Sequence, residues 1–171
     1  GDQAATLPAD YTFVGADNGI HVFTPGVTFQ TSGIQFLIVT DINDGNIAGG
    51  LETIVDVGPP AALVFSYQPF TTQAGAVMSP PVEVMVIDDI GNQAFGFSGQ
   101  VSIAIGTNPS GGTLGGTTTV TATSGLATFS DLTINNAGTG YTLTASSAGL
   151  PNVTSDPFDI AHNVMTRDLA T

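Results

Sequence analysis

A segment near the start of the chain is repeated near its end, and this internal repeat constrains the fold more than any single motif. Residues 18–23 match residues 124–129, and residues 33–38 match residues 138–143. The offset is 106 residues for the first pair and 105 for the second, about the length of one β-sandwich domain. The first copy has no counterpart of residues 62–110 before it. The repeat therefore predicts two modules of one kind, the first without its opening strands.

Alternation of apolar and polar residues predicts a series of short strands through the second copy. The expected strands are residues 62–67, 82–88, 95–106, 117–122, 125–134, 140–146 and 156–160. Clusters of Gly, Asn, Asp and Pro separate them, as turns require. Seven strands over about 100 residues are typical of an immunoglobulin-like β-sandwich. The predicted fold class is all-β, with two immunoglobulin-like β-sandwich modules in tandem.

The Gly58-Pro59-Pro60 stretch marks the expected domain boundary, because two prolines make a short, stiff connector. Residues 1–58 are then a partial or complemented module, and residues 59–161 are a complete one. Residues 162–171 follow the last expected strand as a tail. Two hypotheses fit this tail: a linker to a further domain, or a donor segment that adds a strand to a neighbouring molecule.

Several stretches together resemble a known kind of repeat. They are Leu63-Val64-Phe65, Val82-Glu83-Val84, Asp88-Asp89-Ile90-Gly91-Asn92, Ala127-Thr128-Phe129 and Gly138-Thr139-Gly140-Tyr141, with Leu7-Pro8-Ala9-Asp10-Tyr11 in the first copy. The chain is similar to the bacterial Ig-like repeat modules of large secreted and surface proteins, of adhesin or stalk type. In those repeats an opening strand pair precedes the Leu-Pro-Ala-Asp-Tyr segment, whereas residues 1–6 alone precede it here. The resemblance implies an extracellular or cell-surface location and names no ligand.

The charge of the chain limits its partners. Arg167 is the one Lys or Arg against fourteen Asp and Glu, which gives a net charge of −13. Nucleic acid and anionic membrane surfaces are excluded as partners, because phosphate binding needs Lys and Arg. The chain has no run of about 20 apolar residues, so no membrane insertion is expected. Only 9% of the residues are charged, which suits a secreted β-protein better than a cytosolic enzyme.

The two copies differ on one strand in a way that predicts an interface. Tyr141 and Leu143 are expected to face the core, and the match at an offset of 105 puts Phe36 and Ile38 at the same positions. Leu37 and Val39 then stand where the second copy has Thr142 and Thr144.

On another strand, Val22 stands where the second copy has Thr128. A strand that is apolar on both faces has protein on both sides. We therefore predict that Val22, Leu37 and Val39 contact another subunit. The alternative is a monomer that tolerates a few exposed aliphatic residues.

Two acidic turns are the candidate metal sites. The first gathers Asp41, Asn43 and Asp44, and the second contains Asp88 and Asp89. Oxygen ligands of this kind suit Ca²⁺, which is the one ion that the residues support as a cofactor. Neither turn has the full pattern of an EF-hand loop, and Asp and Asn are also ordinary turn formers. Metal binding and turn formation therefore remain alternatives at both places.

The sequence gives little support for catalysis. It has no Cys, and neither His21 nor His162 lies near a Ser in a Gly-x-Ser-x-Gly motif. We therefore expect no enzyme and name no catalytic residue. Asn152-Val153-Thr154 is an acceptor sequence for N-glycosylation, which makes Asn152 a candidate modification site.

These observations predict a structural subunit of an extracellular filament, stalk or surface layer, which forms a homo-oligomer or polymer head to tail by β-strand complementation and apolar contacts. The alternative is an adhesin or glycan-binding accessory module of a larger secreted protein, with a glycan or cell-surface partner. Exposed aromatic residues would then contact the glycan, and the candidates are Tyr11, Tyr67, Phe95 and Phe97.

Overall fold

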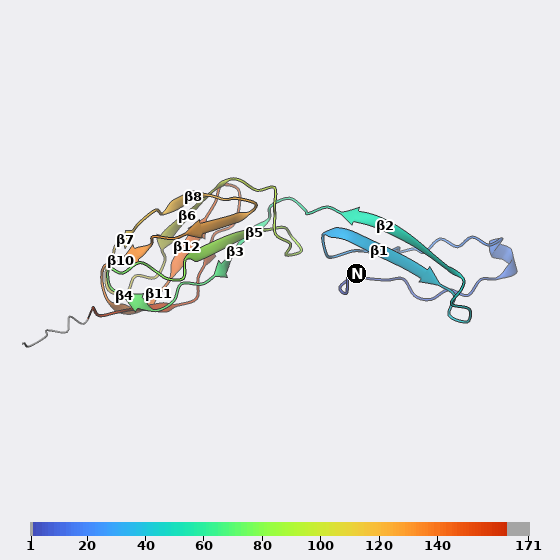
Figure 1. Cartoon of the computed structure of the whole chain (residues 1–171), viewed down its shortest axis with the longest axis horizontal. Helices are drawn as coiled ribbons and strands as arrows, with labels where there is room; N and C mark the ends of the chain where they lie inside the picture. The colour runs from blue at the N-terminus through green and yellow to red at the C-terminus, as the bar shows by residue number, and fades with distance from the viewer. Residues whose placement is uncertain (1, 164–171) are drawn as a thin grey trace, which may run out of the picture. The chain divides into compact units, whose positions relative to one another are not determined.

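A computed structural model describes residues 2–163, and the chain divides into two compact units, Gly1–Val57 and Gly58–Thr171 (Figure 1). The division falls one residue before the boundary expected after Gly58. Strands dominate both units, and the one helical turn among the described residues is η1 (Gly15–Asp17). The predicted all-β fold class is confirmed. Residues 164–171, most of the predicted tail, lie outside the described residues.

The second unit is a β-sandwich of two main sheets. One has the strand order β13-β12-β6-β8 and the other β3-β5-β9, with all pairs antiparallel. Two smaller ladders, β11-β14-β4 and β10-β7, complete the unit, and β4 pairs with β14 in parallel. The strands are β3 (Ala62–Tyr67), β4 (Thr72–Gln73), β5 (Val82–Ile87), β6 (Gln100–Ile105), β7 (Leu114–Gly115), β8 (Thr119–Thr121), β9 (Leu126–Phe129), β10 (Thr133–Ile134), β11 (Gly138–Tyr141), β12 (Leu143–Ser146), β13 (Val153–Thr154) and β14 (Phe158–Ala161).

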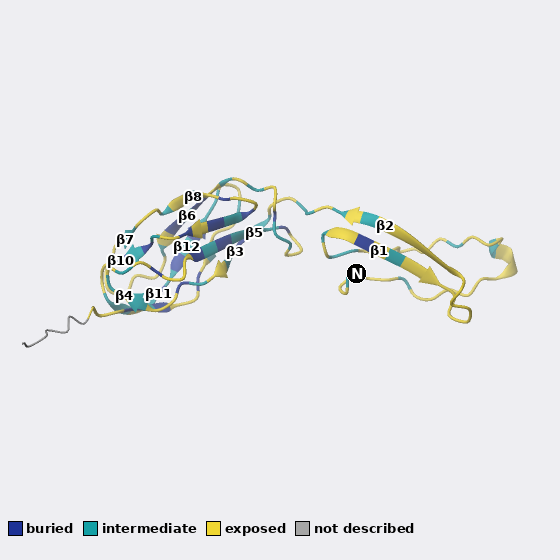
Figure 2. Cartoon of the chain, in the orientation of Figure 1, coloured by how far each residue is buried: buried dark blue, intermediate teal, exposed yellow. Residues whose placement is uncertain are grey.

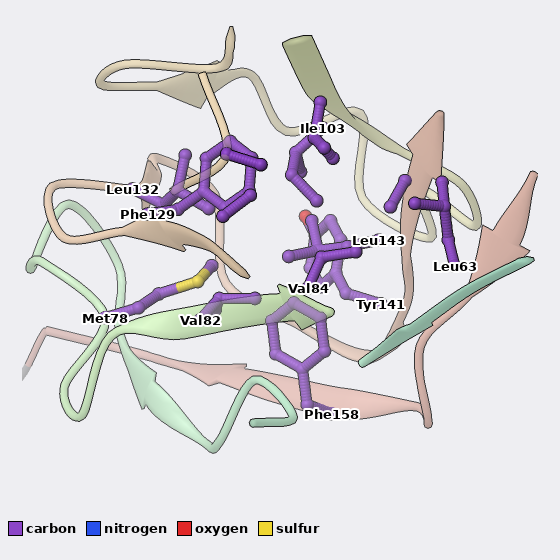
Figure 3. Packing of buried hydrophobic residues seen from close by; sticks show 14 of the residues in the cluster. Leu63, Met78, Val82, Val84, Ile103, Phe129, Leu132, Tyr141, Leu143 and Phe158 are labelled. Carbon is purple, nitrogen blue, oxygen red and sulfur yellow. The ribbon is translucent and has the colours of Figure 1, made fainter. Parts of the chain in front are cut away.

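Side-chain alternation builds the core between the two main sheets. Val82, Val84 and Val86 of β5 are fully buried, and the residues between them are half-buried. Leu143, fully buried at the start of β12, belongs to the same hydrophobic cluster (Figure 3). Tyr141 is also fully buried, and its hydroxyl donates a hydrogen bond to the Asn136 carbonyl at 3.0 Å. The predicted core positions of the second copy are confirmed.

Several expected strands are shorter or broken in the structure. Residues 117–122 are reduced to β8, and residues 140–146 divide into β11 and β12 at Thr142. Residues 95–99 precede β6 as a turn and an irregular segment instead of extending it. The expected strand 125–134 is divided into β9 and β10 around Asp131. The Asp131 carboxylate accepts hydrogen bonds from the backbone N–H and the hydroxyl of Thr117, both at 2.8 Å. These bonds hold a turn where apolar periodicity alone predicted continuous strand, and they lower the pKa of Asp131.

The first unit contains one regular element, the antiparallel hairpin of β1 (Gly33–Thr40) and β2 (Ala48–Val55). The segment before it contributes a single isolated bridge, between Thr6 and Thr28. The carboxylate of Asp2 accepts hydrogen bonds from the backbone N–H groups of Gln30 and Thr31, which ties the start of the segment to its end. In the described part of this unit no second sheet covers the hairpin, which is mostly exposed (Figure 2).

The sandwich core makes a quantitative prediction for Leu143. Replacing Leu143 with Ala removes a fully buried side chain, so the free energy of unfolding of the second unit should fall by about 2–5 kcal/mol. Thr144→Ala is the matched control, because Thr144 is the neighbour on the opposite face and is only half-buried; it should change stability by less than about 0.5 kcal/mol. Urea unfolding of both variants measures the difference. Equal losses would contradict the assignment of the core face.

Candidate interaction surface

The backbone of β1 directs its hydrogen-bonding groups alternately toward β2 and toward a free edge. The Asp41 N–H donates to the Ile47 carbonyl at 2.9 Å, directly beyond the last pair of the hairpin ladder. Bonded pairs alternate in an antiparallel ladder, so Leu37 and Val39 also exchange hydrogen bonds with β2. The residues between them direct their N–H and C=O groups away from β2. These residues are Ile34, Phe36, Ile38 and Thr40.

The equivalent strand of the second unit, β12 with the preceding Thr142, shows which residues of β1 lie on the face that corresponds to the core. The Thr142 carbonyl accepts a hydrogen bond from Gly106 at 2.8 Å, on the β6 side. The Leu143 carbonyl accepts one from Ser155 at 2.8 Å, on the side of the strands that follow. In a strand of L-amino acids the edge to which a residue directs its backbone groups determines the face of its side chain. Leu37 is therefore the equivalent of Leu143.

This equivalence corrects the predicted faces of β1. Phe36 and Ile38 were expected in the core, but their side chains are 58% and 69% exposed, on the face opposite to Leu37. The cause is one extra residue in the second copy: the β11–β14 register shifts between Gly138 and Tyr141, where Gly140 has a φ of +82°. The offset between the copies thus changes from 105 to 106 within the strand, and a shift of one residue exchanges the two faces.

One face of the hairpin, here called the outer face, carries the apolar residues Ile34, Phe36, Ile38 and Ile54, with Glu52 paired to Phe36. Ile34 is paired with Ile54, and these two side chains are 59% and 70% exposed. The second unit has the half-buried threonines 142 and 144 at the places of Phe36 and Ile38. Contiguous exposed apolar residues on one sheet face mark an interaction surface more often than scattered ones do.

The opposite face of the hairpin, here called the inner face, is partly covered. Gln35 is 5% exposed, and its side-chain amide donates to the Thr31 carbonyl at 3.1 Å. Leu37 is half-buried, whereas Val39 is 57% exposed and Leu51, the partner of Leu37, is 62% exposed. The inner face is therefore closed near Gln35 and open near Val39, so the predicted interface residues Leu37 and Val39 lie on the face equivalent to the core of the second unit.

An aromatic cluster lies in the segment before the hairpin. The rings of Tyr11 and His21 stack with centroids 3.3 Å apart, and Phe13 and Phe23 contact this pair edge-on. The Tyr11 hydroxyl donates to the Asp17 carboxylate at 3.0 Å, which raises the pKa of Tyr11. His21 therefore takes part in ring packing.

Val22, the third predicted interface residue, stands beside this aromatic cluster in the chain, between His21 and Phe23. Its side chain is 76% exposed. The segment before the hairpin therefore also presents an exposed aliphatic residue.

The first acidic turn is held by its own side chains. Asp41 accepts hydrogen bonds from the N–H groups of Asn43 and Asp44, at 2.7 and 3.1 Å. Asp44 in turn accepts from the backbone and side chain of Asn46. No group of three His, Cys, Asp or Glu side chains with metal-binding geometry occurs among the described residues. The structure thus shows turn formation at Asp41, Asn43 and Asp44, and a Ca²⁺ site there stays a prediction.

Asp88 in the second acidic turn is buried, with 2% of its surface exposed, while Asp89 is exposed. Both Asp88 oxygens accept hydrogen bonds, from the N–H groups of Gly58, Ile90 and Asn92 and from the Asn92 side-chain amide, at 2.7–3.1 Å. Burial raises the pKa of Asp88, but these hydrogen bonds outweigh it, so the pKa lies below its usual value. The carboxylate is surrounded by donors, as a turn anchor requires.

The remaining candidate residues are scattered over the second unit. Tyr67 is 44% exposed and lies 6.0 Å from the ring of Phe70, and Phe95 is 60% exposed. Phe97, also expected to be exposed, instead packs against the core. Asn152 is exposed on the loop before β13, where a glycan could be attached.

Comparisons with solved structures find similar folds inside larger enzymes. A β-glycosidase from Bacteroides vulgatus is 15% identical with a TM-score of 0.50, over 78% of this chain and 18% of that one. A glycosyl hydrolase family 2 member from Bacteroides cellulosilyticus is 14% identical with a TM-score of 0.48, over 81% and 18%. No protein-family model and no curated protein matches. The likeness to the Bacteroides vulgatus protein is one of fold, and it spans less than a fifth of that protein's length.

The hydrogen bonds to Asp88 predict a specific pH dependence. Because the folded-state pKa is lowered, the stabilisation by the carboxylate is complete above the usual aspartate pKa of about 3.9 and is lost as the pH falls below it. Asp88→Asn should therefore be less stable than the native chain at neutral pH, and the difference should shrink towards about pH 3. Thermal unfolding of both proteins measures this, with Asp89→Asn as the exposed control. A difference independent of pH would contradict the role of the charge.

Proposed function

We propose that the chain is a structural subunit of an extracellular filament, stalk or surface layer, assembled head to tail through its first unit. The observation that supports this proposal is the hairpin of β1 and β2, which is apolar on both faces and carries a free strand edge. The second unit buries a hydrophobic cluster between the sheets of its own sandwich. The first unit has a comparable apolar hairpin and, among its described residues, no second sheet to bury it.

The energetics favour association of this hairpin. Ile34, Phe36, Ile38 and Ile54 are each more than half exposed, and burying one such side chain fully contributes roughly 1.5–3 kcal/mol. Backbone groups on a free edge add hydrogen bonds when another strand pairs with them. An assembled subunit therefore gains the first term at the outer face and the second at the strand edge.

Composition supports the extracellular setting of this proposal. A surface with few charged residues and many Ser and Thr suits a secreted module, in line with the resemblance to Ig-like repeats of surface proteins. The structure shows no helix in residues 2–163 that is both long and apolar enough to span a bilayer. We propose a mechanical role, without catalysis and with Ca²⁺ as an optional ligand of the acidic turns.

A second candidate function is a glycan-binding accessory module of a larger secreted protein. The observation that favours it is the exposed pair of Tyr67 and Phe70, because aromatic rings at a surface can stack on sugars. The Bacteroides vulgatus protein with a similar fold is described as a β-glycosidase. Glycan-array binding by the native chain that is lost in Tyr67→Ala would support this function, and equal binding by both would exclude this pair as the site.

The proposed assembly is tested at the outer face. Phe36→Thr combined with Ile38→Thr restores the residue type found at positions 142 and 144, so it should give folded monomers where the native chain forms regular fibres. Negative-stain electron microscopy and light scattering measure assembly, and circular dichroism checks the fold. Leu37→Asp and Val39→Asp test the inner face in the same way.

The matched control is Tyr67→Thr with Phe70→Thr, which removes similar apolar surface from the second unit and should leave the fibres intact. A native chain that stays monomeric at all accessible concentrations would overturn the proposed function. Fibres that persist in the outer-face variant and in the two inner-face variants would show that assembly uses another surface.

A further inference from the structure

The free edge of β1 is a continuous row of unpaired backbone groups. Among the described residues β1 pairs with β2 alone. The N–H and C=O groups of Ile34, Phe36, Ile38 and Thr40 point to the other edge, as the hydrogen bond between Asp41 and Ile47 establishes. Such an edge can accept a strand from another chain.

The second unit shows the same edge in its occupied form. There β12 has β13 on one side and β6 on the other, and β6 is antiparallel to β12. In that ladder Leu143 is paired with Ile105, and Ala145 is paired with Ile103. All of these side chains except Ile105 are buried, and Ile105 packs against the core cluster.

We infer that the free edge of β1 is a docking site for one antiparallel strand of the β6 type, with aliphatic side chains at alternate positions and no acidic residue. The inference rests on the proposed strand complementation and specifies its edge, direction and register. Because Leu37 is equivalent to Leu143, the incoming strand places one aliphatic side chain beside Leu37. A second aliphatic side chain, two residues away on that strand, lies beside Val39. Both then close the open end of the inner face.

The negative charge of the first unit limits which residues the partner strand can carry. The first unit contains seven acidic residues, Asp2, Asp10, Asp17, Asp41, Asp44, Glu52 and Asp56, and no Lys or Arg. An acidic strand would be repelled, whereas an uncharged strand such as Gln100–Ile105 would not be. The β6 strand of a second copy is already paired on both edges, with β12 and β8. The partner is therefore a separate strand of this composition.

The probe is a synthetic peptide with the sequence of residues 99–106, added to the ¹⁵N-labelled full-length chain at concentrations where that chain is monomeric. Amide hydrogen exchange of β1 is the measurement. We expect exchange at Ile34, Phe36, Ile38 and Thr40 to slow more than about tenfold. The amides of Gln35, Leu37 and Val39 already bond to β2 and should change little. Uniform protection along β1, or none, would overturn the inference.

Two controls separate strand pairing from apolar adhesion. A peptide N-methylated at alternate residues keeps every side chain but loses one edge of donors, so it should give no alternating protection. In the chain, Ile38→Pro removes one N–H from the free edge and leaves the ladder to β2, so it should weaken peptide binding about tenfold. Ile38→Thr keeps that N–H and should bind the peptide with affinity close to that of the native chain. Should Ile38→Pro disturb the hairpin, the N-methylated peptide still decides the question.

The outcome is independent of fibre formation. Alternating protection in a chain that never polymerises would sustain this inference and overturn the proposed assembly. Fibres formed by a chain whose β1 edge never binds the peptide would sustain the proposed assembly and overturn this inference. The subunit contact would then be assigned to the outer face.

Discussion

Burial of one sheet face against another is the constraint on which the rest of this chain depends. In the second unit, β5 and β12 place fully buried side chains between two sheets, and hydrogen-bonded turns such as the one at Asp131 close the layers around them. The first unit has the equivalent of β12 in β1, followed by a longer β2. Since its described part contains no second sheet, the same kind of hairpin is left with two apolar faces and a free edge.

Alternation in the sequence was sufficient for two strands of the second unit that pack in its main sheets. It predicted β3 with its observed bounds and β5 to within one residue, because the core side of β5 is a valine at every second position and the core side of β3 is Leu63 followed by Phe65. It failed where side-chain hydrogen bonds overrule periodicity, as at Asp131, and for residues 95–99, where Phe97 packs on the core from an irregular segment instead of a strand.

The faces of β1 show a subtler limit of repeat matching. Gly33 is identical to Gly138 before Gly140, and Phe36 and Ile38 are similar to Tyr141 and Leu143 after it, so the alignment gives no sign that one residue is extra. A one-residue slip reverses inside and outside, and only the backbone hydrogen bonds of Asp41 and Leu143 reveal it. The prediction of a strand apolar on both faces was independent of this error, because Phe36, Leu37, Ile38 and Val39 are apolar in either register. The acidic turns posed a different problem, since cation ligands and turn anchors use the same residue types.

The negative charge of the chain bears on how the exposed hairpin of the first unit could bind a partner. With one Lys or Arg against fourteen acidic residues, the proposed assembly has few ion pairs to draw on, so its contacts would come from apolar burial and backbone pairing. Apolar burial and backbone pairing do not by themselves distinguish one partner strand from another. An exposed strand edge with apolar faces is therefore prone to aggregation. A net charge of −13 opposes such contacts between unaligned copies, because close approach without good packing gains little against the repulsion. In the proposed assembly, a partner overcomes this repulsion when it pairs in the backbone register of β1 and also buries the apolar faces of the hairpin. The negative charge of the surface would therefore select such partners over strands that pair with the free edge out of register.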